Sequence, residues 1–196
     1  MANKDAPFGL QPIRHLNGNP WNGGVMRCNI KAAETDPYGI GTTVLFAGSS
    51  NARGVPDVEE TTVGVTNEIL GVITGFKANP DSLAPNWRPD AAQDDDRICY
   101  VCVDPDVIFI IQDDATATLT ADSVFLNANI ARAADPTAAG GGIAREELDA
   151  TGASADVTAQ LIILGLHDVP GNDIGDNAVW EVMINLHQLA RPILGL

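Results

Sequence analysis

Three histidines are the residues of this sequence best suited to acid–base catalysis near neutral pH: His15, His167 and His187. The sequence contains no G-x-S-x-G nucleophile elbow to accompany them. His167 directly precedes Asp168, but a single adjacent pair of this kind is too common to identify a catalytic dyad. We therefore expect solvated or hydrogen-bonded imidazoles, and the sequence predicts that the protein is not an enzyme.

The three cysteines do not have the spacing of a metal or redox site. Cys99 and Cys102 form a C-x-x-C pair, but they lie in RICYVCV, whose alternation and β-branched residues are typical of a strand. Residues three apart on a strand point to opposite faces of a sheet, so these two thiols are poorly placed to hold one ion or form one disulfide. Together with Cys28 they are expected to be buried structural thiols, and no cofactor is expected.

Glycine-rich segments offer no phosphate-binding loop. GIGTTVLF, which begins at Gly39, continues into β-branched residues where a helix N-terminus would be needed. The triplet Gly140–Gly142 lacks the lysine and hydroxyl of a P-loop. Both segments are predicted to be turns.

Carboxylate clusters are a stronger signal, because hard cations such as calcium bind oxygen ligands in loops. None of the clusters has the D-x-[DN]-x-[DN]-G spacing followed by a distal glutamate. We therefore expect solvated acidic loops and no metal site, with a cation site as the alternative. The clusters are Asp94 to Asp96, Asp113 with Asp114, and the group formed by Asp168, Asn172, Asp173, Asp176 and Asn177.

The charge balance argues against several classes of partner. With 26 acidic and 11 basic residues, the 196-residue chain has a formal net charge of -15, which repels a nucleic-acid backbone. Apolar runs such as Val107–Ile111 and Leu161–Leu166 are too short to cross a bilayer, and the opening MANKDAPFGL has no apolar stretch of signal-peptide length. We expect no nucleic acid, no membrane and no export by the standard route.

The first residues differ in charge and composition from the rest of the chain. Residues 1–31 carry a net charge of +3, which leaves -18 for the remainder. The segment APFGLQPIRHLNGNPWNGG is rich in proline and glycine and cannot form a helix. We predict an extended N-terminal arm over residues 1–24 that docks on another surface. The alternative is that this segment folds back onto its own acidic body.

Residues 25–196 are predicted to form a single β-rich domain, because short β-prone runs alternate with turn signals. RICYVCV and VIFIIQ, joined by Asp104–Asp106, are the best candidate hairpin, and their apolar faces indicate central strands. The fold class expected is all-β: an antiparallel sandwich or barrel, jelly-roll-like or OB-like. Strands are expected at about 26–32, 42–47, 60–66, 69–77, 97–103, 107–112, 144–150, 157–167 and 178–188, and long loops at 79–96, 131–142 and 167–177.

Both ends of the chain carry a resemblance to a known group of proteins. The opening MANKDAPFGLQPIRHLNGNPWNGG, the closing AQLIILGLHDVPGNDIGDNAVWEVMINLHQL and the intervening DPDVIFIIQ resemble the head decoration, or cement, proteins of tailed phages. This resemblance implies a non-enzymatic virion protein that is made in the host cytoplasm and located on the capsid exterior. It further implies binding to the major capsid protein, as a homo-oligomer such as a trimer or dimer.

Docking on a capsid would use the apolar and basic residues of the N-terminal segment, since aromatic side chains bury area and arginines pair with carboxylates. One alternative is another virion role, as a tail or fibre component. A second is a loop-based carbohydrate-binding module that uses the acidic loops with Trp87 or Trp180. The predicted docking residues are Phe8, Leu10, Ile13, Arg14, Trp21 and Arg27.

Overall fold

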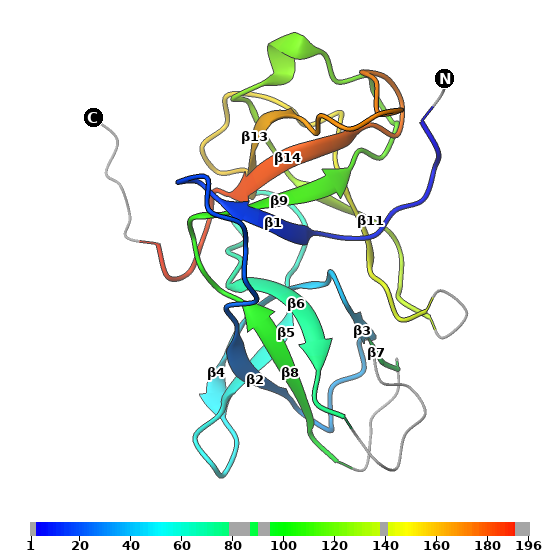
Figure 1. Ribbon diagram of the computed structural model, residues 1–196. Helices are drawn as coiled ribbons and strands as arrows, with labels where there is room; N and C mark the ends of the chain where they lie inside the picture. Colours follow the sequence, from blue (N-terminus) through cyan, green and yellow to red (C-terminus); the bar gives the residue numbers. More distant parts are fainter. Residues whose placement is uncertain (1–2, 79–86, 90–94, 138–140, 191–196) are drawn as a thin grey trace.

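The protein is represented by a computed structural model that describes residues 3–78, 87–89, 95–137 and 141–190 (Figure 1). A five-stranded antiparallel sheet lies above a closed five-stranded barrel in the view of Figure 1. The order in the sheet is β1 (Gln11–His15), β9 (Val107–Gln112), β14 (Val179–Ile184), β13 (Leu161–Leu166) and β10 (Asn127–Ala128). The order in the barrel is β2 (Met26–Ile30), β5 (Pro56–Glu60), β4 (Thr43–Ser50), β6 (Gly71–Phe76) and β8 (Arg97–Cys102).

Two short ribbons complete the architecture. β11 (Ile130–Ala134) pairs with β12 (Arg145–Leu148), and β3 (Tyr38–Gly39) pairs with β7 (Trp87–Arg88). The helical turn η1 (Ala121–Ser123) lies between β9 and β10. The all-β prediction is therefore confirmed. Within the described residues, no helix has the length and apolar character needed to cross a bilayer.

The five-stranded sheet and the barrel, the two bodies of the fold, each have an apolar core. The strand periodicity explains which side chains enter each core. On β14 the alternating residues Trp180, Val182 and Ile184 are buried under the sheet, as the sequence pattern predicts. On β8, Cys99 faces the barrel core, whereas Cys102 belongs to the core of the sheet. The expectation that the C-x-x-C thiols point to opposite faces is confirmed.

The predicted hairpin of β8 and β9 is wrong. β8 pairs with β2 and β6 in the barrel, and β9 pairs with β1 and β14 in the sheet. The turn at Asp104–Asp106 does form, because the Asp104 carboxylate accepts the Asp106 N–H at 2.9 Å, but it carries the chain from one body to the other. Both strands are central, as their apolar faces indicate. Each already pairs with a neighbour on both of its backbone edges, so β8 and β9 cannot pair with each other.

The extended N-terminal arm is also not what the structure shows. Residues 11–15 form β1, which extends the sheet by pairing with β9, and Leu10 is buried in the core of the sheet. The Leu10 N–H donates to the Gly41 carbonyl at 3.1 Å, which ties the segment to the barrel side as well. The alternative, in which the segment folds back onto its own body, is correct for this part of the chain. The segment folds back because β1 pairs with the backbone edge of β9 that β14 leaves open, and because burial of the apolar Leu10 side chain is favourable.

Some strand boundaries differ from those expected. The strand expected at 60–66 is β5 at Pro56–Glu60, and the following loop is held by the buried amide of Gln160, which bonds to Gly64 N and Thr62 O. The start of the loop expected at 131–142 is part of β11. Most of the loop expected at 79–96 lies outside the described residues. The Gln160 hydrogen bonds leave no periodic trace in a sequence, and β11 depends on its pairing with the distant β12.

Candidate functional site

The six predicted docking residues do not form one exposed set. Leu10 is 1% exposed and serves the core. Arg14 forms an ion pair with Glu181 on β14 of its own chain. Ile13, Phe8 and Trp21 are half-buried, and of the six only Arg27 is exposed. Leu10 and Trp21 both line the groove described next, Arg27 lies beside it, and Arg14 is held by Glu181.

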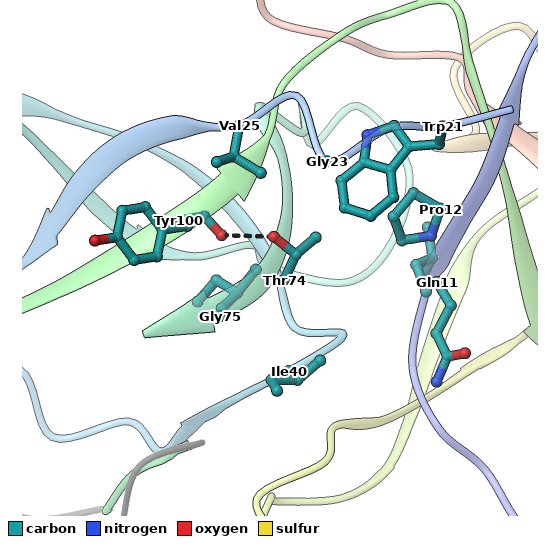
Figure 2. Close-up of a pocket in the computed structure, with 11 residues that line it drawn as sticks. Gln11, Pro12, Trp21, Gly23, Val25, Ile40, Thr74, Gly75 and Tyr100 are labelled. Atoms are coloured by element: carbon teal, nitrogen blue, oxygen red, sulfur yellow. Dashed lines mark hydrogen bonds between the residues drawn. The ribbon is translucent and has the colours of Figure 1, made fainter. Parts of the chain in front are cut away.

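A groove of about 420 Å³ lies at the junction of sheet and barrel (Figure 2). In Figure 2 Pro12 and Trp21 lie at one end, Tyr100 lies at the other, and Ile40 lies below Thr74. The Thr74 hydroxyl donates to the Tyr100 carbonyl at 3.2 Å, which links β6 to β8 beneath the groove. The lining is mainly apolar and comes from β1, β6, β8 and the connection before β2.

The N-terminal turn formers explain how Trp21 reaches this groove. The chain reverses after β1: the His15 N–H donates to the Asn19 carbonyl at 2.8 Å, and the Trp21 N–H donates to the Ile13 carbonyl at 3.2 Å. Gly23, which follows, has φ +84°, a conformation that non-glycine residues rarely adopt. The composition that suggested an extended arm therefore specifies a tight reversal, which sets the indole against the core of the sheet.

Arg27 adds a positive charge beside the groove. It is the cross-strand partner of Tyr100, so the two side chains lie on the same outer face of the barrel. Arg27 has no ion pair in the part of the chain that the structure describes. The result is an apolar groove with a free guanidinium next to it on an otherwise acidic protein.

The three histidines are spread over the structure and each has a nearby structural partner. His15 Nδ1 lies 3.3 Å from Asp104 Oδ2, and His167 Nδ1 lies 3.1 Å from a carboxylate oxygen of Glu181, not of Asp168. His187 is buried and its Nδ1 accepts the Leu189 N–H at 3.0 Å; burial lowers the pKa of this imidazole. Each imidazole thus lies beside a polar partner, as expected from the sequence for hydrogen-bonded histidines.

The cysteines are buried and free. Burial raises the pKa of the Cys28 thiol to about 12 and that of Cys102 to about 11, and it raises the pKa of Cys99 as well. All three are therefore neutral near physiological pH. Because the thiolate is the reactive form, nucleophilic chemistry at these positions is disfavoured.

Several members of the acidic clusters serve the fold. Buried Asp113 accepts hydrogen bonds from Trp180 Nε1 at 3.0 Å and from the N–H groups of Ala115, Asn177 and Ala178 at 2.9–3.1 Å. Asn172 bonds to the backbone of His167 and Val179 and closes the loop before β14. Among the described residues no group of three or more metal-ligating side chains is assembled. Asp94 lies outside the described residues.

The aromatic residues considered for carbohydrate binding differ in access. Trp180 is fully buried in the core of the sheet, so it cannot stack on a sugar. Trp87 is half-buried on β7. Of the two tryptophans in the carbohydrate-binding alternative, Trp180 is unsuitable, because its alternation on β14 places it with the apolar face.

Several residues of the site were not found from the sequence. Tyr100 is one that could have been, since the alternation of RICYVCV already sets it opposite the buried Cys99 and Val101. Ile40 and Thr74 reach the groove only through the pairing of distant segments, which no local pattern reveals. Comparisons with models of protein families, with curated proteins and with solved structures find no match to this chain.

Proposed function

We propose that this protein is a non-enzymatic virion protein that binds the outer surface of a tailed-phage capsid and stabilises contacts between major capsid protein subunits. The observation that carries the proposal is the groove at the junction of sheet and barrel, with Trp21 on one side and the free Arg27 beside it. An apolar groove with an adjacent guanidinium suits a protein segment that offers an apolar side chain and a carboxylate.

The folded N-terminal segment supports a rigid docking surface in place of a flexible arm. Because β1 and the turn after it are fixed by hydrogen bonds, Trp21 loses little conformational freedom when a partner binds. The acidic remainder of the chain suits an exterior surface that faces solvent. A dimer or trimer would bring two or three such grooves to neighbouring capsid subunits and gain from effective concentration.

The test is co-sedimentation of purified protein with capsids assembled from the phage's major capsid protein without this chain. Two variants change the groove at exposed positions that the fold tolerates: Val25→Asp and Arg27→Glu. Arg53→Glu, in the exposed turn between β4 and β5, is the matched charge control.

We expect wild type and Arg53→Glu to sediment equally with capsids, and each groove variant to bind at least tenfold more weakly, a loss of about 1.4 kcal/mol. If all four proteins fail to bind, the proposed function is wrong. If all four bind equally, the groove is not the docking surface. Removal of residues 1–24 is not a useful test, because it deletes β1 and Leu10 from the sheet.

A further inference from the structure

A second pocket, of about 630 Å³, lies between residues 4–7 and the β11–β12 ribbon. The N-terminal segment is held over it by the buried Gln112, whose Nε2 donates to the Lys4 carbonyl at 2.7 Å and whose Oε1 accepts the Ala6 N–H at 2.9 Å. The pocket is separate from the groove of Figure 2: the two have no lining residue in common.

Glu147 is the unusual residue of this pocket. It lies on β12, is only 7% exposed and lines the cavity, yet its carboxylate has no hydrogen bond or ion pair within the part of the chain that the structure describes. The carboxylate oxygens open to the pocket, and burial of the rest of the residue makes the ionised form costly. The neighbouring Glu146 points to the other face of β12 and shows the usual solution, since it pairs with Arg132 at 3.1 Å.

The charges around Glu147 make its ionised form still less favourable. Asp5 from the N-terminal segment, and Asp113 and Asp114 after β9, act on it electrostatically. Its cross-strand partner on β11 is Ala131, which brings no charge. Burial, followed by these three carboxylates, raises the pKa of Glu147 to about 7.

The two basic residues of the pocket do not neutralise Glu147. Lys4 and Arg145 both line the pocket, but both side chains are exposed and neither forms an ion pair in the described ranges. These two basic side chains therefore lie toward solvent, and Glu147 is the buried residue of the described lining.

The walls indicate an organic cation. The lining is more polar than apolar, but it includes alanine and proline side chains that suit the alkyl stem of an ammonium or guanidinium group. A metal ion is disfavoured, because the described residues assemble no group of three metal-ligating side chains. These apolar wall residues are Ala6, Pro7, Ala115, Ala133 and Ala134.

We propose that this pocket binds an organic cation, a primary ammonium or a guanidinium on an alkyl chain, with Glu147 as its counter-ion. The source is a lysine or arginine side chain of a partner protein or a free polyamine, which offer the same chemistry. The bound cation supplies the positive partner that Glu147 has no counterpart for among the described residues. The affinity is highest where Glu147 is ionised, above about pH 7.

The test is a calorimetric and NMR titration of the full chain with three probes: Nα-acetyl-lysine methylamide, Nα-acetyl-arginine methylamide and putrescine. Each titration is run near pH 8 and near pH 5.5 on wild type, Glu147→Gln, Asp5→Asn and the control Glu68→Gln, whose exposed carboxyl lies outside the pocket. The amide spectrum of every variant verifies that it folds.

We expect saturable binding of at least one probe near pH 8, weakened at least tenfold near pH 5.5 and at least tenfold in Glu147→Gln. Asp5→Asn should weaken it several-fold, and Glu68→Gln should leave it unchanged. Tighter binding of the capped amino acids assigns the site to a protein side chain, and tighter binding of putrescine assigns it to a polyamine. The proposal is overturned if no probe saturates, if Glu147→Gln binds as wild type does, or if calcium alone binds in a Glu147-dependent way. Because no capsid is used, these outcomes are independent of the proposed function.

Discussion

At the scale of single residues, polar side chains that look functional in the sequence mostly hold this fold together. Asp113 belongs to a carboxylate cluster that suggested a cation site, yet its two oxygens accept hydrogen bonds from β14 and the turns beside it. Arg88 is buried and donates to the carbonyls of Lys31, Ala32 and Glu34. The hydrogen-bond partners of Asp113 and Arg88 come from distant parts of the chain. The structural roles of these two residues could therefore not be predicted from the residue types alone.

Replacement of Asp113 by asparagine tests this structural role. The amide retains one acceptor oxygen, but its NH₂ faces N–H donors that the second carboxylate oxygen satisfied. We expect a loss of about 2–3 kcal/mol in the free energy of unfolding. Urea unfolding followed by circular dichroism measures it, with Asp122→Asn at an exposed position as the control. Equal stability of the two variants would show that the network contributes nothing.

Glu147 predicts a pH dependence of stability. Its pKa is raised from the ordinary 4.5 to about 7 in the folded protein, so between these values the folded state binds more protons than the unfolded state. The stabilisation from this group is fully present below pH 4.5 and is lost as pH rises through 7. Glu147→Gln removes the charged form, so near pH 8 it should be more stable than wild type by about 1 kcal/mol.

The measurement is urea unfolding of wild type and Glu147→Gln from about pH 5 to pH 8, with Glu68→Gln as the control. The stability gap between the two proteins should widen in favour of Glu147→Gln as pH rises. A gap that stays constant across this range would contradict the burial of an ionisable, unpaired carboxyl.

At the scale of elements, local patterns predicted most of the central strands but not their partners. RICYVCV and VIFIIQ are strands β8 and β9 as expected, because β-branched residues and apolar faces are local properties. Their assignment to two different bodies depends on which strands compete for each edge. β1 was missed because Pro12 and the surrounding turn formers hide a strand, and its register indeed shifts between Pro12 and Arg14.

Gly41 tests whether the N-terminal segment is an integral part of the fold. Gly41 has φ +95°, and a Cβ there would lie 2.6 Å from the Phe8 carbonyl oxygen. We expect Gly41→Ala to cost about 3 kcal/mol, from backbone strain and displacement of this segment. Gly48→Ala is the matched control, because Gly48 has φ +71° but open space around it, so only the backbone term of about 1 kcal/mol applies. Similar melting temperatures for the two variants would argue against the close packing of residues 8–10 on Gly41.

At the scale of the whole molecule, the chain leaves the sheet after β1, forms the barrel and returns to the sheet after β8, and the groove lies at the junction of the two. β1, the connection to β2, and the barrel strands β6 and β8 all contribute to it (Figures 1 and 2). The sequence pointed to Trp21 and Arg27, which line or flank the groove, and to Leu10 and Arg14, of which Leu10 is buried and Arg14 is paired with Glu181. The burial of Leu10 and the ion pair of Arg14 are tertiary properties, so only part of the candidate site could be predicted.

An electron cryo-microscopy map of capsids decorated with this protein tests the central proposal most directly. We expect density for the chain on the outer surface of the shell, with the face that carries Trp21, Arg27 and Tyr100 against the major capsid protein. Density in which this face points into solvent, or a location of the chain in the tail or a fibre, would contradict it.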